Sequence, residues 1–491
     1  MQKISVKTIY LILVISIGLV GLGVGSTFAM FTASSKIDNP ISFTAGIFGE
    51  SDVIETVEVT VPAGETKATN LHVTNSTNSN LNYVMWYIDE GLDIELGSKR
   101  TDSGTYQTTI DAGEEHKYEV SIRNNSSSSV TVVIGVSSGT GSVTLSSDMK
   151  MVPQSELKLK PTLASVITNL YNNSTKTAVP NNSITYQYDT TNNLMKDTAG
   201  NIRYYGASPN NYVYFNCDSY PSTNCELWRI IGVFDGKIKL IRNKTIDLYS
   251  WDNKNKSTGA ETAYGKNDWT TARLMKLLNP STYYTTDAND NGKGQSLYWN
   301  ATSGACYSDQ NNATISCNFT STGIKDTTRN MIAETTWNLV GWNTSDIYSN
   351  VMYEKERGTT TVSNPSDGIT RATTWTGKIA LPYPSDYGYA TDLSKCSQTL
   401  FNYNSGTDSY ACRSNDWMYS IITNSGINDG WLLTPYSGYA YMAFGVHSSG
   451  YVNGYGVYTA FMVAPVLYLG SDQDIVSGDG SQSNPYQLAN S

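Results

Sequence analysis

A pattern of turn, strand and polar loop occurs twice in the N-terminal third of the chain, and no other feature constrains the fold as much. The turn Pro62–Glu65 precedes LHVTNSTNSN, and the turn Asp111–Glu114 precedes VSIRNNSSSS. The two turn glycines are 49 positions apart, and so are Asn75 and Asn124. Two copies are too few for a solenoid, which needs about three repeats. We therefore expect the copies to pack against each other as two halves of one core.

The region that contains the two copies, residues 31–153, has the alternation that is typical of strands. The segment VIETVEVTV over residues 53–61 alternates apolar and polar residues, and similar short runs are separated by Gly, Asn and Ser. Successive side chains of a strand point to opposite faces, so this pattern predicts strands with one buried face. A succession of such strands predicts an antiparallel β-sandwich.

The N-terminal segment, residues 1–30, predicts export. Lys3 and Lys7 precede an apolar run from Ile9 to Val24, and the small residues around Thr27 and Ala29 follow it. This order is that of a signal peptide cut before Met30. Left uncut, residues 9–29 would form a membrane anchor, because the run is only just short of the about 20 residues that a span needs. Both alternatives put the rest of the chain on the outer side of the membrane.

The six cysteines agree with export. They form three groups of near neighbours, Cys217 with Cys225, Cys306 with Cys317, and Cys396 with Cys412. An exported chain with an even number of cysteines favours disulfides, and we expect these three local pairs among the 15 possible pairings. Six reduced, buried cysteines are the alternative. The chain has no C-x-x-C spacing, which argues against a redox or zinc role.

Charge and histidine content exclude several functions. The net charge is −10 and basic residues are not clustered, whereas nucleic-acid binding needs Lys and Arg to replace the counterions of phosphate. The three histidines, His72, His116 and His447, are far apart in the sequence. We therefore expect no nucleic-acid partner, no metal site, no cofactor and no catalytic residues.

The C-terminal part of the chain begins with a predicted linker helix over residues 154–175. Apolar residues recur at helical spacing from Leu163 to Leu170 after Pro161. Residues 176–491 mix predicted strands and helices in an α+β pattern. They include a hairpin over 228–246 around Asp235 and Gly236, and a helix over 327–339.

Two resemblances extend this interpretation. The segment Gly25–Phe31, with Asn39 and Phe43-x-Ala45-Gly46, is similar to the start of camelysin-type exported proteins of biofilm fibres. In that family a β-sandwich follows the signal, so the resemblance implies the same fold here. The match covers about 25 residues.

The second resemblance covers residues 165–490. WRIIGVF (228–234), KIALPYPSDYGYATD (378–392), WLLTPYS (431–437) and the run from Val463 to Tyr486 resemble an uncharacterised domain of cell-surface proteins from Gram-positive gut bacteria. That domain implies a C-type-lectin-like fold, shared with formylglycine-generating enzymes and with the variable proteins of diversity-generating retroelements. The family usually has Arg where this chain has Ala464, so an internal arginine contact is missing or replaced.

Residues 436–461 form the strongest candidate site. They are rich in aromatic and polar side chains separated by Gly, Ala and Ser. Tyrosine offers a large contact area, few torsions to freeze and a hydroxyl, which suits a recognition surface. The candidate ligand-binding residues are Tyr436, Tyr439, Tyr441, Phe444, His447, Tyr451, Asn453, Tyr455, Tyr458 and Phe461.

Three interpretations of this segment stay open: tyrosines that pack against one another, a fixed ligand-binding face, and a face diversified by a retroelement, as the resemblance implies. We expect recognition of a glycan or a surface-protein ligand. A structural matrix or fibre component without a specific ligand is the alternative, and an enzyme of formylglycine-generating-like fold ranks third.

Other polar motifs predict structural roles. Residues 287–292 have the first half of a calcium loop, but its twelfth position is Tyr298 rather than Glu. Asp386 is expected to accept hydrogen bonds from loop amides. The charged segment from Glu354 to Arg357 is expected to be a solvated turn.

Overall fold

A computed structural model shows a mixed α+β chain, mostly strands with few helices, that divides into two compact units, Met1–Pro161 and Thr162–Ser491. The structure describes residues 41–45, 53–75, 77, 79–88, 94–96, 108–124, 126–139, 150–151, 158–159, 162–255, 264–285, 292–358, 370–404, 409–470 and 473–489. The predicted signal or anchor, residues 1–30, lies outside these ranges, and so do residues 287–291 of the calcium-loop candidate. None of the helices in the described ranges has the length and apolar character that crossing a bilayer requires.

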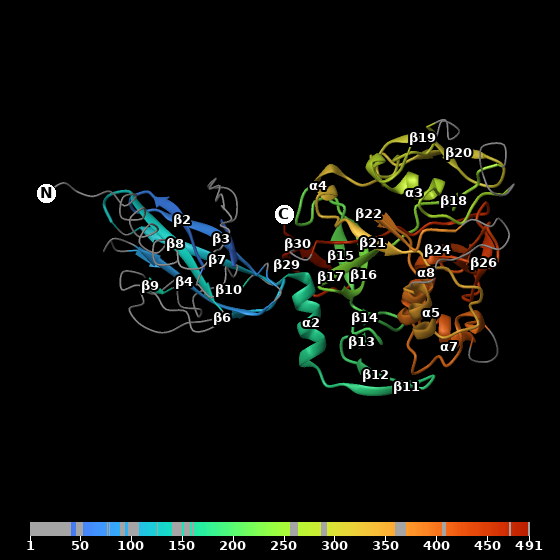
Figure 1. The fold of residues 1–491 in the computed structure, drawn as a ribbon, viewed down its shortest axis with the longest axis horizontal. Coiled ribbons are helices and arrows are strands. Elements are labelled where there is room, and N and C mark those ends of the chain that lie inside the picture. Colours follow the sequence, from blue (N-terminus) through green and yellow to red (C-terminus); the bar gives the residue numbers. More distant parts are fainter. Residues whose placement is uncertain are drawn as a thin grey trace, which may run out of the picture. The chain divides into compact units, whose positions relative to one another are not determined.

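The first unit contains two five-stranded sheets within its described residues, and Figure 1 shows them in blue and cyan. One sheet contains β1 (Ile41–Ala45), β3 (Thr66–Asn75), β7 (Glu115–Asn124), β10 (Lys158–Leu159) and β5 (Ile94–Leu96). The other contains β2 (Val53–Val61), β8 (Val130–Gly139), β4 (Leu81–Ile88), β6 (Thr108–Ile110) and β9 (Lys150–Met151). Apart from the parallel pair β1–β3, the pairings are antiparallel.

The internal repeat predicted from the sequence is confirmed in this unit. Its two copies place β3 and β7 side by side, with Thr66 opposite Arg123 and Thr74 opposite Glu115. The turn before each strand has a glycine in the left-handed region, Gly64 at φ +72° and Gly113 at φ +75°. With the offset of 49 residues, Thr66 is equivalent to Glu115 and Thr74 to Arg123. The start of each strand therefore lies opposite the end of the equivalent strand.

The second unit is built on a large sheet that follows the order β11-β12-β13-β14-β16-β15-β30-β29, with β17, β28 and β23 branching from it. The strands are β11 (Thr177–Asn181), β12 (Ile184–Asp189), β13 (Leu194–Lys196), β14 (Ile202–Tyr204), β15 (Tyr212–Phe215), β16 (Glu226–Phe234), β17 (Lys237–Arg242), β23 (Ile379–Ala380), β28 (Val466–Tyr468), β29 (Ile475–Ser477) and β30 (Tyr486–Leu488). The predicted hairpin is confirmed as β16–β17, and Asp235 and Gly236 both have positive φ in its turn, as a type I′ turn requires.

A second sheet of this unit carries the tyrosine-rich segment. Its order is β18-β27-β24-β25-β26. The strands are β18 (Leu248–Ser250), β24 (Gly430–Pro435), β25 (Met442–Val446), β26 (Val452–Gly456) and β27 (Ala460–Met462). Two further hairpins complete the unit, formed by β19 (Ser303–Tyr307) with β20 (Thr314–Asn318), and by β21 (Thr335–Asn338) with β22 (Thr374–Gly377).

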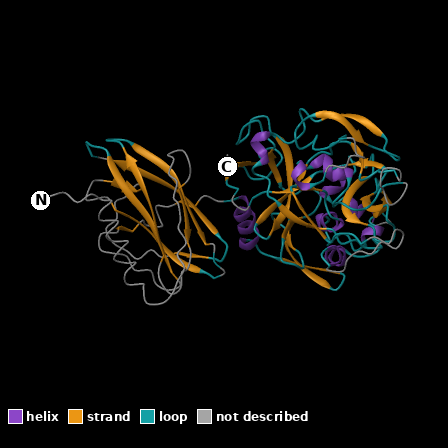
Figure 2. Ribbon diagram, turned by 45° about the horizontal axis from the view of Figure 1, so that its top comes forward, coloured by secondary structure: helices purple, strands orange, loops and turns teal. Residues whose placement is uncertain are grey.

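The described helices all belong to the second unit, where Figure 2 shows them in purple. They are α2 (Leu163–Asn173), α3 (Arg273–Leu278), η3 (Ser281–Tyr283), α4 (Asp326–Arg329), α5 (Ser349–Glu356), α6 (Pro384–Ala390), η5 (Leu400–Asn402), α7 (Ser409–Arg413) and α8 (Trp417–Ile422). The N-cap of α2 is Thr162, whose hydroxyl accepts from the backbone amide of Ser165. Leu163 and Ile167 of α2 are fully buried in the core of this unit.

The helix predicted over residues 327–339 is wrong beyond Arg329. The structure has the single-turn α4 and then the strand β21. Trp337 of β21 is paired with Trp375 of β22 and packs against Tyr468 with ring centroids 5.2 Å apart. Packing of this aromatic side chain therefore overrides the local helical pattern.

The three local disulfides are confirmed as Cys217–Cys225, Cys306–Cys317 and Cys396–Cys412. The structure contains no free cysteine. Three disulfides indicate that this unit matures in an oxidising environment, such as the outside of the cell.

Candidate functional site

The candidate site is built on the hairpin of β25 and β26. Ala443 lies opposite Tyr455 and Gly445 opposite Asn453, so these four residues share one face of the hairpin. The other face carries the buried Phe444 together with Gly454 and Gly456, and Tyr436 and Tyr458 pack against it. Tyr455, on the same face as Asn453, packs against the buried ring of Phe461 with ring centroids 5.0 Å apart.

Two of the ten candidate residues are buried rather than exposed. Phe444 lies on the core side of β25 and packs edge-on against Tyr436, with ring centroids 5.3 Å apart. Phe461 of β27 packs against Trp431, with centroids 4.6 Å apart. Both rings belong to the hydrophobic core, so neither is part of an exposed face.

Five tyrosines form a continuous row of neighbouring rings. The centroid distances along the row are 6.3 Å from Tyr436 to Tyr439, 5.8 Å from Tyr439 to Tyr441, 6.2 Å from Tyr441 to Tyr264, and 5.0 Å from Tyr264 to Tyr458. Tyr439 is 48% exposed and Tyr264 is 42% exposed. Separations of this size are those of interacting aromatic pairs.

Three more rings form a second group at the other end of the hairpin. His447 and Tyr451 are stacked, with centroids 4.5 Å apart and an interplanar angle of 17°. Tyr451 also contacts Phe401, which is 43% exposed and lies 6.0 Å away. We use the name tyrosine surface for the two groups of rings: Tyr264, Phe401, Tyr436, Tyr439, Tyr441, His447, Tyr451 and Tyr458. Asn453 lies on the opposite face of β26 from Gly454 and Gly456, against which Tyr436 and Tyr458 pack.

Sequence reasoning missed Tyr264 and Phe401. Both lie outside residues 436–461. Tyr264 lies in the connection before α3, and Phe401 lies in the short helix η5. Neither has a local pattern that distinguishes it from the chain's other aromatic residues. Only the fold brings them beside the hairpin.

Glycines in the candidate segment make room for rings. A Cβ added at Gly454 would lie 2.5 Å from the ring of Tyr436, and one at Gly456 would lie 2.5 Å from the ring of Tyr458. Contacts this short do not occur without a shift of the ring. The glycines therefore allow these tyrosines to lie flat against the hairpin.

The turn between β25 and β26 is held from outside the hairpin. The guanidinium of Arg413 in α7 donates to the carbonyl of Ser449 at 2.9 Å, and the hydroxyl of Tyr419 in α8 donates to the carbonyl of Ser448 at 2.5 Å. The amide of Ser448 donates to Asp429 at 2.8 Å. These bonds fix the end of the hairpin at which His447 and Tyr451 lie.

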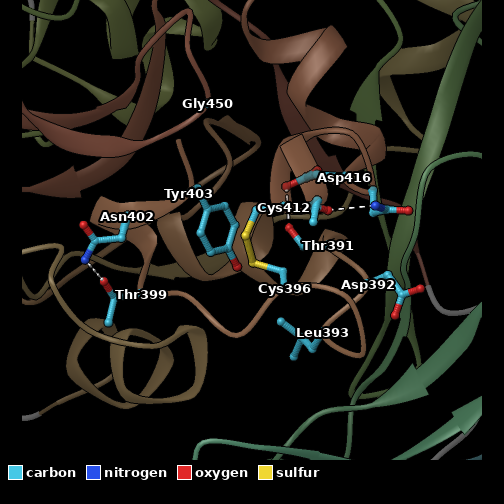
Figure 3. Close-up of a disulfide and its surroundings, with 12 residues drawn as sticks. Thr391, Asp392, Leu393, Cys396, Thr399, Asn402, Tyr403, Cys412, Asp416 and Gly450 are labelled. Atoms are coloured by element: carbon cyan, nitrogen blue, oxygen red, sulfur yellow. Dashed lines mark hydrogen bonds between the residues drawn. A yellow bond between two sulfur atoms is a disulfide. The ribbon is translucent and has the colours of Figure 1, made fainter. Parts of the chain in front are cut away.

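The disulfide Cys396–Cys412 fixes α7 in turn. Figure 3 shows it beside Tyr403 and close to the hydrogen bond of 2.8 Å from the Thr391 hydroxyl to Asp416. Cys412 directly precedes Arg413. The disulfide therefore supports the residue that holds the turn of the candidate site.

A second feature of this unit is a buried cluster of charges around Asp386. Its carboxylate accepts from Arg203 at 2.9 Å and from Lys239 at 2.5 Å, and Arg203 also pairs with Asp197 at 2.6 Å. These side chains are at most 1% exposed. Burial alone would raise the pKa of Asp386, but Lys239 and Arg203 lower it to about 2.

Asp386 accepts from the amide of Tyr383 at 3.0 Å, as expected, and also joins the ion pairs that the sequence did not reveal. The solvated turn over Glu354–Arg357 is wrong, because Glu356 is fully buried at the end of α5. It accepts from the amide of Ser385 at 3.0 Å and pairs with Arg357 at 2.9 Å.

A cleft of about 380 Å³ opens beside this cluster, and we call it the polar cleft. Aromatic side chains of Phe234, Trp337, Tyr353, Tyr383 and Tyr468 line it. Its polar lining comes from Asn201, Asp235, Lys237, Glu334, Asn338 and Arg357, with Thr335 and Thr336. The polar cleft and the tyrosine surface have no residue in common.

Comparisons with protein-family models, with curated proteins and with solved structures gave no match. Within the described residues, no group of three or more His, Cys, Asp or Glu side chains is arranged to hold a metal ion.

Proposed function

We propose that this chain is an exported surface protein that recognises a glycan or a protein ligand through the tyrosine surface. The observation that carries the proposal is the row of contacting rings from Tyr436 to Tyr458, two of which are more than two-fifths exposed. Exposed rings that are already ordered by their neighbours lose little conformational entropy on binding.

The chemistry of the tyrosine surface suits recognition. A tyrosine ring offers an apolar face, its hydroxyl can donate or accept a hydrogen bond, and large aromatic side chains dominate the binding energy of many interfaces. His447, stacked on Tyr451, adds a polar group beside the rings, and it lies 3.9 Å from Asp429. Stacking against a sugar ring and insertion into a protein groove both use these features.

The rest of the proposal rests on the sequence resemblances. In it, the first unit is a β-sandwich stalk similar to camelysin-type proteins, and the second unit is a C-type-lectin-like domain. The two five-stranded sheets of the first unit and the disulfides of the second support this assignment. Residues 1–30 would supply the export signal or a membrane anchor.

Binding by the full-length oxidised chain tests the proposal. We would screen it against immobilised glycans and against bacterial and mucosal surface proteins, together with a variant that combines Tyr439→Ser, Tyr441→Ser and Tyr458→Ser. A matched control is Tyr214→Ser, because Tyr214 of β15 is partly exposed and does not belong to the tyrosine surface. The proposal expects saturable binding that the triple variant loses and the control keeps.

Two results would contradict the proposal. A folded wild-type chain that binds nothing in the screen would favour the structural alternative, a matrix or fibre component without a specific ligand. Binding that survives in a folded triple variant would place the ligand elsewhere on the chain. The class of the bound molecule separates a glycan ligand from a protein ligand.

A further inference from the structure

Exposed apolar side chains gather around the turn between β25 and β26. Tyr410 and Ile427 are 67% and 72% exposed, the largest fractions among the large apolar side chains of the described residues, and Phe401 is also exposed. Exposed apolar side chains that gather in one place mark an interaction site more often than single ones do.

Two contacts place Phe401 and Tyr410 beside this turn. Phe401 packs edge-on against Tyr451, the residue that follows the turn, with ring centroids 6.0 Å apart. The guanidinium of Arg413 lies 4.7 Å from the ring centroid of Tyr410 and donates to the carbonyl of Ser449 in the turn. The two apolar side chains thus reach the turn from different helices, η5 and α7.

Ile427 reaches the same turn from the segment after α8. A Cβ added to its neighbour Gly426 would lie 3.2 Å from the carbonyl of Ser448 and 2.5 Å from the hydroxyl of Tyr419, which donates to that carbonyl. The backbone beside Ile427 therefore lies against the turn. We use the name turn patch for the apolar side chains around the turn and for two charged neighbours: Asp346, Phe401, Tyr410, Arg413, Ile427 and Tyr451.

The turn patch contains one positive and one negative charge. Arg413 forms no ion pair with any described residue, and it donates only to the carbonyl of Ser449. The exposed Asp346 accepts through Oδ1 from the hydroxyl of Thr399 at 2.7 Å and from the amide of Asn402 at 3.0 Å. Neither charge is balanced by an opposite charge in the part of the chain that the structure describes.

The other carboxylate at the turn is already engaged. Asp429 accepts from the amide of Ser448 at 2.8 Å and lies 3.9 Å from Nε2 of His447. Arg413 and Asp346 are thus the charged groups of the turn patch that a partner can pair with.

We infer that the turn patch binds the turn patch of a second copy of this chain. In a dimer with twofold symmetry, a contact between two different residues occurs twice, once in each direction. Arg413 of each copy would pair with Asp346 of the other copy, and the exposed apolar side chains would be buried in the same contact. Any other protein would have to supply both opposite charges, whereas a second copy supplies them by symmetry.

The net charge of −10 repels a second copy at long range. At physiological ionic strength the Debye length is about 8 Å, so charges remote from the contact are largely screened and those at the turn patch count most. The inference goes beyond the proposed function and does not rest on it, because the row of tyrosines from Tyr436 to Tyr458 lies outside the turn patch.

Sedimentation equilibrium of the full-length oxidised chain at physiological salt, over a range of micromolar concentrations, tests the inference. We expect the wild type to show a monomer–dimer equilibrium. Arg413→Glu and Asp346→Arg each place like charges opposite each other twice, and each should weaken the dimer about tenfold or more. Lys293→Glu is the matched control, since Lys293 is exposed and outside the turn patch and the substitution changes the net charge as Arg413→Glu does. It should leave the dissociation constant unchanged.

A mixture of Arg413→Glu and Asp346→Arg separates a lost ion pair from a damaged fold. In a mixed dimer the new glutamate of one variant faces the new arginine of the other, and the unchanged Asp346 faces the unchanged Arg413. We expect the mixture to dimerise about as tightly as the wild type, although each variant alone dimerises weakly. Misfolded variants would not regain dimerisation on mixing.

Three outcomes would overturn the inference. A wild type that stays monomeric would leave the turn patch for a different protein that carries both opposite charges. A dimer that neither charge reversal weakens would show association through another part of the chain. A mixture that associates no more tightly than its two components would show that Arg413 and Asp346 do not meet across the dimer.

Discussion

Asn75 and Asn124 make equivalent hydrogen bonds, each to the opposite copy of the internal repeat. The amide of Asn75 donates to the carbonyls of Ile110 and Asp111 at 3.2 and 3.0 Å, while the amide of Asn124 donates to those of Val61 and Pro62 at 2.9 and 3.1 Å. Each side chain also binds its own polar loop, through Ser79 and Ser128 at 2.8 Å. The two asparagines thus fasten each turn to the loop of the other copy.

Replacing either asparagine should therefore destabilise the first unit to the same extent. Both are fully buried, and Asn75→Ala or Asn124→Ala leaves several carbonyls without donors. We expect a loss of about 1–3 kcal/mol in the free energy of unfolding for each variant. Hydrogen exchange of the β3 and β7 backbone amides at increasing urea concentration would measure it in the full chain.

Ser79→Ala is the control, because Ser79 takes part in this network only through its backbone carbonyl and amide. It should change the stability by less than about 0.5 kcal/mol, as surface substitutions usually do. Very different losses for Asn75→Ala and Asn124→Ala would show that the two copies are not energetically equivalent.

The ion pairs of Asp386 predict an asymmetry between two substitutions. Asp386→Asn leaves Arg203 and Lys239 buried without their shared anion, and we expect it to cost about 3–5 kcal/mol. Lys239→Met should cost less, since Asp386 keeps Arg203 and the methionine remains between the rings of Tyr383 and Phe234. Chemical denaturation of the two variants would compare them, and equal losses would contradict the argument.

The buried carboxyl group of Asp416 should make the stability of the fold depend on pH. It caps α8, accepting from the amides of Met418 and Tyr419, and its complete burial raises its pKa to about 8. A carboxyl group whose pKa is higher in the folded than in the unfolded state favours folding while it is protonated. We therefore expect the stability of the wild type to fall as the pH rises from about 4, the pKa of unfolded Asp, to about 8.

The variant Asp416→Asn isolates this group, because an asparagine can still cap the helix. Melting temperatures from pH 4 to pH 8 should decline less for the variant than for the wild type. If the two profiles run parallel, Asp416 is ionised throughout, stabilised by the hydroxyl of Thr391 and the two amides.

The absence of a side chain at Gly454 should be required for ligand binding by the tyrosine surface. Gly454→Ala places a methyl group against the ring of Tyr436 and should tilt that ring out of the row. We expect weaker ligand binding by the tyrosine surface and a loss of stability of about 1–3 kcal/mol, as for other overpacked sites. Ser437→Ala, next to Tyr436, is the control and should change neither the affinity nor the unfolding curve.

The sequence predicted the features that residues close together in the chain determine. Asp235-Gly236 is a turn because both residues adopt positive φ, and the cysteines pair with near neighbours. The 49-residue repeat was visible because both copies keep their turn and their asparagine.

The remaining features depend on contacts between distant segments. Glu356 looks solvated in the sequence, but its partner Ser385 comes from α6. Arg203 and Lys239 meet Asp386 only after β14, β17 and α6 have assembled. Tyr264 joins the tyrosine surface in the same way. No periodicity along the chain marks such positions, because their partners are far away in the sequence. Asp386 is more than 100 residues from Arg203 and from Lys239, and Ser385 is 29 residues from Glu356.

The disulfide Cys396–Cys412 should stabilise both the fold and the candidate site. It closes a loop of 16 residues, for which the chain-entropy argument gives about 3 kcal/mol. Without it, α7 is less constrained and Arg413 holds the carbonyl of Ser449 less firmly. The double variant Cys396→Ser/Cys412→Ser should therefore lose ligand affinity as well as stability, as measured by titration and thermal unfolding. The control variant Cys217→Ser/Cys225→Ser removes a bridge in a different part of the unit. It should lower stability, while the folded protein keeps its ligand affinity. Equal losses of affinity in the two double variants would show that the Cys396–Cys412 bridge has no specific role at the tyrosine surface.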